Sequence, residues 1–314
     1  MPPIVLLGPQ RLRPMLREAA EAIGGPARIA AITGGWEERE LEDDELTQHF
    51  DGPVVNLRLH HRLETMLADD PELMRHLHRR QDRLQRRRDL YHIRLAHALD
   101  AARELLRLPG THRDLEAARE DAIRTVHAID DHHVERVQDL DRAFKEDFDV
   151  GARPALAYHR QELAEMLGAC DAIAIAGGHV GRLLEQLRLF DLGAALGARP
   201  VIAWSAGAMA LGRRVVLFHD APPQGPGDAE VHDVGLARYD GFLPLPHARH
   251  RLRLDDPVRV GLFARRFAEV RCVAMDEGAR LLVTEDGLQH ATGCRWLQPD
   301  GTVVDTPATS GAPA

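Results

Sequence analysis

The sequence has few cysteines, no excess of positive charge and no long hydrophobic run. Its three cysteines, Cys170, Cys272 and Cys294, are odd in number and far apart, so we expect reduced thiols rather than a disulfide framework. The formal net charge of −9 argues against a general nucleic-acid-binding protein, because phosphate neutralisation needs a basic excess. No stretch approaches the roughly 18 consecutive apolar residues that indicate a membrane span.

The first residues also lack the features of a targeting signal. Residues 1–8 carry no basic region, and their apolar run is too short for a signal peptide. Together with the cysteine usage, this predicts a cytoplasmic protein without a membrane partner. The rest of the composition, 44% hydrophobic and 28% charged, is typical of a globular protein with ample material for a core.

Short apolar runs alternate with helical segments at both ends of the chain. This pattern is typical of an α/β protein whose mostly parallel sheet is covered by helices on both faces. The expected strands are Ile4–Leu7, Ala27–Thr33, Val54–Leu57, Ala172–Ala176, Pro200–Trp204, Val215–Phe218, Phe242–Pro246, Cys272–Met275, Arg280–Val283 and Gln289–Thr292.

The central part of the chain, residues 70–148, is charged and strongly helical. Residues 70–107 carry 10 arginines against 6 acids, and residues 111–147 carry 11 acids against 6 basic residues. Leu108-Pro109-Gly110 breaks the helix, so two antiparallel arms of opposite charge bias are expected to attract each other. We therefore predict a helical hairpin at 70–148, inserted into a discontinuous α/β domain made of residues 1–69 and 149–302. Residues 303–314 are expected to be a disordered tail.

Ser205 lies at an abrupt change from strand to helix, in the stretch Val201–Ala208. A tight turn at such a place projects a hydroxyl from the end of the sheet, as in a nucleophile elbow. The N–H of Ala206 could donate to an oxyanion. A second donor could come from the Gly177-Gly178 turn, because neighbouring strands end at the same edge. The alternative is a packing turn with an incidental serine.

A nucleophilic serine needs a base, and His247 is the strongest of 18 histidines. It follows the apolar segment Phe242–Pro246, so it too lies at a strand end. Arg251 and Arg253 follow it, in a local basic cluster that could bind a carboxylate. The alternative is a solvated helix start. Histidine pairs elsewhere lack the carboxylate or cysteine spacing of a metal site, and no metal is predicted.

Three acids could orient the base. Asp276 and Glu277 follow the apolar run Cys272–Met275, and Asp220 ends the run that begins at Val215. The residues alone do not rank them.

Four stretches resemble motifs of the peptidase E and cyanophycinase family, which are serine hydrolases on the class I glutamine amidotransferase-like fold. They are the nucleophile motif Trp204–Ala208, the Gly-Gly turn and helix of Ala176–Leu184, His247 with its spaced arginines, and the acid-bearing segment Met275–Leu282. The resemblance covers residues 171–292 well and 1–57 weakly. A glutamine amidotransferase activity is disfavoured, because those enzymes carry cysteine at the elbow.

The resemblance implies a three-layer α/β fold and hydrolysis of an amide without a cofactor. It favours Glu277 as the acid beside Ser205 and His247, with Gly178 and Ala206 as the oxyanion hole. Gly177, His179, Arg251 and Arg253 would contact the substrate, a small acidic peptide or an isopeptide of aspartate. The loop at 221–228 is expected to act as a lid.

The sequence departs from the family pattern at three positions. His179 stands where the family has Asn or Asp, Pro246 where cyanophycinases have Gln, and Asp256 where a third arginine would fall. The long hairpin lies outside the resemblance and is expected to cap the pocket or to mediate homodimerisation. The alternative function is a non-catalytic scaffold in which the hairpin is the working part.

Overall fold

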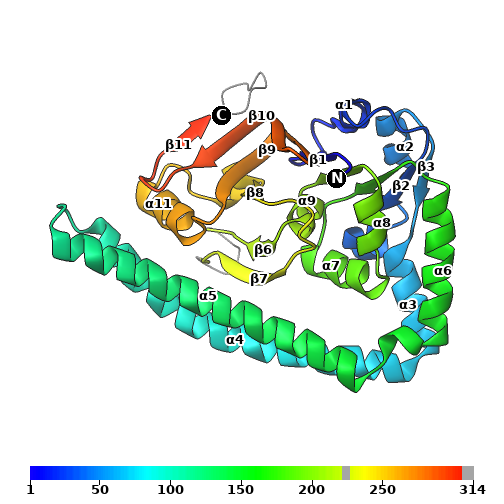
Figure 1. The fold of residues 1–314 in the computed structure, drawn as a ribbon, viewed down its shortest axis with the longest axis horizontal. Coiled ribbons are helices and arrows are strands. Elements are labelled where there is room, and N and C mark those ends of the chain that lie inside the picture. The colour runs from blue at the N-terminus through cyan, green and yellow to red at the C-terminus, as the bar shows by residue number, and fades with distance from the viewer. Residues whose placement is uncertain (221–226, 306–314) are drawn as a thin grey trace.

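A computed structural model of the chain describes residues 1–220 and 227–305 (Figure 1). Its centre is a nine-stranded sheet with the order β11-β10-β9-β1-β5-β4-β2-β3, and β8 pairs with β9 outside this path. Strands β1 to β5 of this sheet pair in parallel. Strand β9 is antiparallel to β1 and β10, β11 is antiparallel to β10, and β8 is parallel to β9. The strands are β1 Ile4–Leu7, β2 Ile29–Ile32, β3 Val54–Asn56, β4 Ala172–Ile175, β5 Val201–Trp204, β8 Phe242–Pro246, β9 Arg271–Thr284, β10 Gly287–Leu297 and β11 Val303–Asp305.

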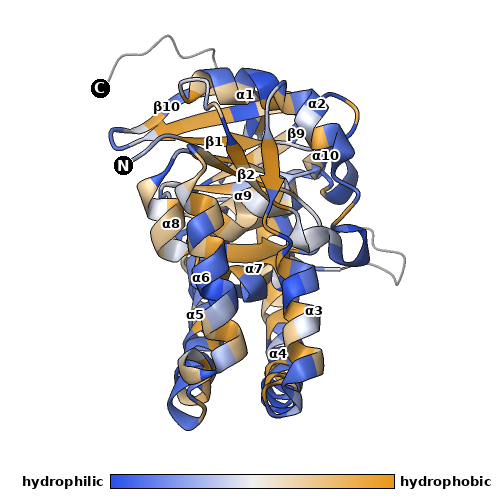
Figure 2. Ribbon diagram, turned by 90° about the vertical axis from the view of Figure 1, so that its right-hand side faces the viewer, coloured by the Kyte–Doolittle hydropathy of each residue, from blue (hydrophilic) through white to orange (hydrophobic). Residues whose placement is uncertain are grey.

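The sheet separates two hydrophobic cores, because alternate side chains of a strand point to opposite faces. In β1, Val5 and Leu7 join the core that is covered by α1 (Leu16–Ala22) and α2 (Asp44–Phe50). Ile4 and Leu6 join the core on the other face. That face is covered by α3 Leu59–Asp69, α6 Pro154–Gly168, α7 Val180–Leu189 and α9 Ala206–Leu211. The predicted three-layer α/β fold is confirmed, and Figure 2 shows the hydrophobic strands between the helices.

The smaller elements connect these layers. They include two 3-10 helices, Gly34–Arg39 and Val150–Ala152, and a separate antiparallel pair of strands. The pair is β6 Arg214–Leu217 with β7 Glu230–Val234, and the remaining short helices are α8 Gly193–Ala198, α10 Ala248–Arg251 and α11 Pro257–Arg266. None of the described helices is both long enough and apolar enough to cross a membrane.

Two expectations about the C-terminal part are wrong. The strands expected at Cys272–Met275 and Arg280–Val283 are one strand, β9, which continues past Gly278 because that glycine adopts a φ of 82°. Residues 303–305, expected in the disordered tail, form β11, because the long β10 offers them an edge at Arg295–Leu297. Residues 306–314 and most of the expected lid, 221–226, lie outside the described residues.

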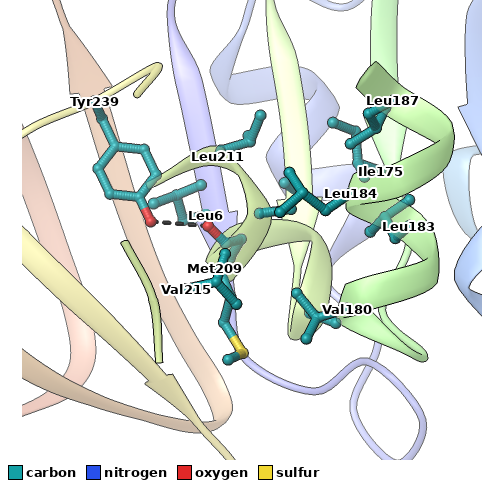
Figure 3. Packing of buried hydrophobic residues seen from close by; sticks show 14 of the residues in the cluster. Leu6, Ile175, Val180, Leu183, Leu184, Leu187, Met209, Leu211, Val215 and Tyr239 are labelled. Atoms are coloured by element: carbon teal, nitrogen blue, oxygen red, sulfur yellow. Dashed lines mark hydrogen bonds between the residues drawn. The ribbon is translucent and has the colours of Figure 1, made fainter. Parts of the chain in front are cut away.

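Helix α9, which follows Ser205, is fixed by dense packing. Met209 and Leu211 lie among apolar side chains from β1, β4, α7 and β6 (Figure 3). The hydroxyl of Tyr239, itself buried, donates a 2.8 Å hydrogen bond to the carbonyl of Ala208. The start of this short helix therefore has little freedom to move.

The two long helices are α4 (Pro71–Arg107) and α5 (Arg113–Asp147), which lie side by side along one side of the sheet (Figure 1). Asp70 caps α4 by accepting a hydrogen bond from the N–H of Leu73, and Pro71 occupies the first turn. The predicted helices and the break between them are thus observed. Their separation from the α/β part as a domain of their own stays a prediction.

A buried ion pair joins the hairpin to the α/β part. Arg266 of α11 donates two 2.7 Å hydrogen bonds to the carboxylate of Asp130 on α5, and the two side chains are 2% and 1% exposed. Tyr91 of α4 donates to the same carboxylate and accepts from Arg266 and from the N–H of Val231. This network joins α4 and α5 to α11 and β7, and thus fixes the hairpin against the α/β part.

We predict that Asp130→Ala lowers the free energy of unfolding by about 3–5 kcal/mol, because it leaves the Arg266 guanidinium buried without its partner. Urea unfolding followed by circular dichroism measures this loss. The matched control is Asp139→Ala on the same helix, which removes an exposed ion pair with Arg142 and should cost less than about 1 kcal/mol. Equal effects of the two variants would contradict the assigned role of the network.

Candidate active site

Ser205 occupies a strained turn between β5 and α9. Its backbone has φ 52° and ψ −119°, a conformation that costs a residue with a side chain on the order of 1–3 kcal/mol. The turn is held by the N–H of Ser205, which donates to the carbonyl of Leu7. A Cβ on Gly207 would lie 2.4 Å from the carbonyl oxygen of Ile175, so this close approach of helix and strand requires glycine. The geometry is that of the expected elbow.

His247 meets Ser205 at the end of a different strand. The distance from Ser205 Oγ to His247 Nε2 is 3.1 Å, within hydrogen-bond range. His247 follows β8 directly and has a φ of 59°, and its N–H donates to the carbonyl of Met275. The sequence-predicted pair of nucleophile and base is therefore brought together.

The strand ends converge in a way that the sequence did not predict. Strand β8 is parallel to β9 and ends opposite Met275, whereas β1 is antiparallel to β9 and ends opposite Arg280. Both strands pair with the same edge of β9, and their carboxyl ends point towards each other with residues 276–279 of β9 between them. Ser205 follows β5, the parallel neighbour of β1, so the serine and the histidine meet above this part of β9.

The three candidate acids have different surroundings. Asp276 Oδ1 accepts a 2.9 Å hydrogen bond from the N–H of Arg249. Its Oδ2 forms an ion pair with the guanidinium of Arg295 at 2.7 Å. Asp220 accepts from the N–H of Arg253 and pairs with the guanidinium of Arg259. Both carboxylates are thus fully engaged in holding loops and helices.

Glu277 differs from the other two acids because its carboxylate is not engaged by another described side chain or N–H group. Its side chain is partly exposed, and within residues 1–220 and 227–305 it makes no hydrogen bond or ion pair, including with His247. It lies in the gap between the ends of β1 and β8. Its charge still acts on the base. Burial lowers the pKa of His247, Arg251 lowers it further, and Glu277 and Asp276 raise it.

Two backbone amides that find no acceptor within the described ranges lie next to Ser205, in the structure or in the sequence of the adjoining turn. Gly177 packs so closely that a Cβ there would lie 3.0 Å from the Cβ of Ser205, and Gly178 has a φ of 111°. A Cβ on Gly178 would clash with the carbonyl of Gly35 at 2.1 Å. Among the described residues, the N–H groups of Gly178 and Ala206 find no acceptor. Such free donors beside a nucleophile are suited to bind an oxyanion.

His179 caps the N-terminus of α7 and is exposed. Its Nδ1 accepts a 3.1 Å hydrogen bond from the N–H of Arg182, which is the capping contact that Asn or Asp makes at a helix start. Although His179 departs from the family pattern, it still caps the N-terminus of α7.

The two arginines after His247 lie in different places. Arg251 is partly buried, it is close enough to lower the pKa of His247, and its side chain has no hydrogen-bond partner in the part of the chain that the structure describes. Arg253 is exposed and lines a cavity shared with Arg103 of α4 and Arg259 of α11, whose lining includes neither Ser205 nor His247. The structure thus places one of the two beside the candidate base.

Two supporting contacts were missed by the sequence reasoning. One is the Asp276–Arg295 ion pair between β9 and β10, and the other is the carbonyl of Leu7 that holds Ser205. Neither has a local sequence signal, because both join segments that meet only in the folded sheet. Within the described ranges, no group of three or more His, Cys, Asp or Glu side chains is placed to hold a metal ion.

A comparison with known families gives a match to peptidase family S51 over residues 125–291, which is more than half of the chain. The chain belongs to peptidase family S51. The S51 peptidase is accordingly a serine-type hydrolase, as the resemblance implied, and the non-catalytic alternative is not supported. The matched range includes Ser205, His247 and Glu277.

Other comparisons add little. The S51 peptidase is similar to the crystal structure of a peptidase from an acI-B1 Actinobacterium, at 12% identity and a TM-score of 0.45 over 95% of this chain and 91% of that one. A search of the curated proteins finds no match.

The lowered pKa of His247 predicts the acid side of the pH–rate profile. A general base must be neutral, so kcat/KM should fall only below the ordinary histidine value of about 6.5. Glu277→Gln removes a charge that raises this pKa, and should move the acid limb to lower pH. Arg251→Gln should move it to higher pH. Steady-state cleavage between pH 4 and 8 measures these shifts. An apparent pKa of the wild-type acid limb above about 6.5, or shifts of the opposite sign in the variants, would contradict the assignment of His247.

Proposed function

We propose that the S51 peptidase hydrolyses small acidic or Asp-linked peptides through Ser205, His247 and Glu277. The observation that carries this proposal is the 3.1 Å contact between Ser205 Oγ and His247 Nε2 at a strained turn with two unpaired amides. A nucleophile, a base within hydrogen-bond reach and nearby oxyanion donors are the parts that acyl transfer needs.

The proposed reaction has two steps. Ser205 Oγ attacks the amide carbonyl carbon while His247 Nε2 takes the hydroxyl proton, and the N–H groups of Gly178 and Ala206 bind the oxyanion. The intermediate collapses, the C–N bond breaks, and His247 gives its proton to the leaving amine. Water then attacks the carbonyl carbon of the acyl-serine while His247 takes its proton. The C–O bond to Ser205 breaks, His247 returns the proton to Ser205 Oγ, and the carboxylic acid product leaves.

Glu277 would stabilise the imidazolium of His247 in both steps. Three features support it over its neighbours: Asp276 and Asp220 are engaged elsewhere, Glu277 lies in the gap beneath the base, and its charge raises the pKa of His247. The proposal requires its side chain to turn towards Nδ1 when substrate is bound, which is consistent with the looser contacts of unliganded sites.

Arg251 would bind a carboxylate of the substrate. Its guanidinium is partly buried without a partner, and burial lowers its pKa, so a bound carboxylate would replace the solvation that it has lost. Gly177 and His179 would border the substrate on the side of the elbow. Arg253 would contribute less to substrate binding, because it lines a cavity with Arg103 that includes neither Ser205 nor His247.

The test is a panel of dipeptides and Asp-linked isopeptides incubated with wild-type protein and Ser205→Ala, with products followed by mass spectrometry. Wild type should cleave and the variant should lose at least about a thousandfold in rate, as triad variants do. Retained cleavage by a folded Ser205→Ala would rule out the serine.

The arginines provide a matched pair for substrate recognition. Arg251→Gln should raise KM for acidic substrates by about tenfold or more, which is the loss of one charge-assisted hydrogen-bonded contact, and should affect a neutral substrate little. Arg253→Gln should leave both KM values near wild type. Equal effects of the two variants, or an Arg251 effect without regard to substrate charge, would contradict the carboxylate assignment.

A further inference from the structure

The outer face of α4 carries a continuous exposed stripe. Its eight residues follow one another at spacings of three and four, which places them on one side of a helix. All eight are exposed: Arg79, Arg83, Arg86, Leu90, Ile93, His97, Asp100 and Glu104. At about 1.5 Å per residue the stripe is about 37 Å long. Hereafter these eight residues are called the α4 stripe.

The α4 stripe is polar at both ends and apolar in the middle. Leu90 and Ile93 at its centre are 65% and 61% exposed, which is unusual for two adjacent large apolar side chains on one face. They border a groove of about 430 Å³ between α4 and α5, which also includes Ile129 and Arg136 of α5. This groove could receive apolar side chains from a partner.

The charges of the stripe change sign about its centre. Arg79, Arg83 and Arg86 precede the apolar pair, and among the described residues their side chains make no hydrogen bond or ion pair. Asp100 and Glu104 follow it, and Asp100 contacts only Arg103 one turn on, with its own side chain 70% exposed. Arg79 and Arg83 are therefore free to pair with the two acids of another copy.

We propose that a second copy of this chain packs antiparallel along the α4 stripe, about a two-fold axis between Tyr91 and His92. In this register Leu90 faces Ile93 of the other copy. Arg83 then faces Asp100, Arg79 faces Glu104, and Arg86 faces His97. A two-fold interface uses the same patch twice and must be self-complementary, and the order basic–apolar–acidic fulfils that condition.

A wholly acidic partner fits the same surface less well. It would attract Arg79, Arg83 and Arg86 but would be repelled by Asp100 and Glu104, because like charges across an interface oppose binding. A second copy avoids this conflict. The buried network of Tyr91, Asp130 and Arg266 lies directly behind the stripe and holds α4 in place, so that little order is lost on association.

Sedimentation velocity of the full chain tests the apolar centre. The dimer fraction of wild type should rise with protein concentration by mass action, and the dimer should be the main species at about 100 µM. Leu90→Glu/Ile93→Glu should be monomeric. The control Leu41→Glu, at a leucine that is 55% exposed outside the hairpin, should dimerise like wild type. A monomeric wild type, or a dimer that survives the double variant, would overturn the proposal.

Charge exchange tests the antiparallel register. Arg83→Asp alone and Asp100→Arg alone should each raise the dimer dissociation constant at least about fivefold, because every dimer contains the pair twice and each single change opposes like charges. Arg83→Asp/Asp100→Arg should return it to within about twofold of wild type. Failure of the double exchange to restore dimerisation would overturn this register. Unchanged circular dichroism of all variants shows that folding is not the cause.

Discussion

The contact between β9 and the two strands that end on it, β1 and β8, sets the positions of Ser205, His247 and Glu277. Because one of these strands is antiparallel to β9 and the other is parallel, their carboxyl ends face each other across residues 276–279. The turn after β5 and the turn after β8 then deliver Ser205 and His247 to the same place. The close approach depends on Gly8, where a Cβ would lie 2.0 Å from the carbonyl oxygen of Asp276.

The candidate nucleophile and base both have strained backbone conformations, which the surrounding sheet holds in place. Ser205 and His247 both have positive φ, which sequence-distant contacts must hold in place. The carbonyls of Leu7 and Met275 do so by accepting from their N–H groups. Asp276 adds a third support, since it binds the N–H of Arg249 just after the histidine and is fixed by Arg295.

The sequence predicted what is local and missed what depends on distant segments meeting. The elbow at Ser205 could be recognised because strand, serine and Gly207 are adjacent in the chain. The family resemblance selected His247 as the base and Glu277 as the acid. It did not show how they meet, because the opposed directions of β1 and β8 relative to β9 have no local sequence signal. The spacing of Arg251 and Arg253 likewise does not reveal that one lies beside His247 and the other beside Arg103. The break expected between two strands is bridged by Gly278, whose positive φ only the folded sheet requires.

The central claim is that Ser205 is the nucleophile activated by His247, and labelling with a fluorophosphonate tests it most directly. The chain has only two serines, Ser205 and Ser310, so peptide mass spectrometry can assign the modified position without ambiguity. The account predicts one phosphonyl group, on Ser205, and at least about a hundredfold slower labelling of a folded His247→Ala. A fully active protein that is not labelled at Ser205, or labelling that proceeds equally fast without His247, would contradict it.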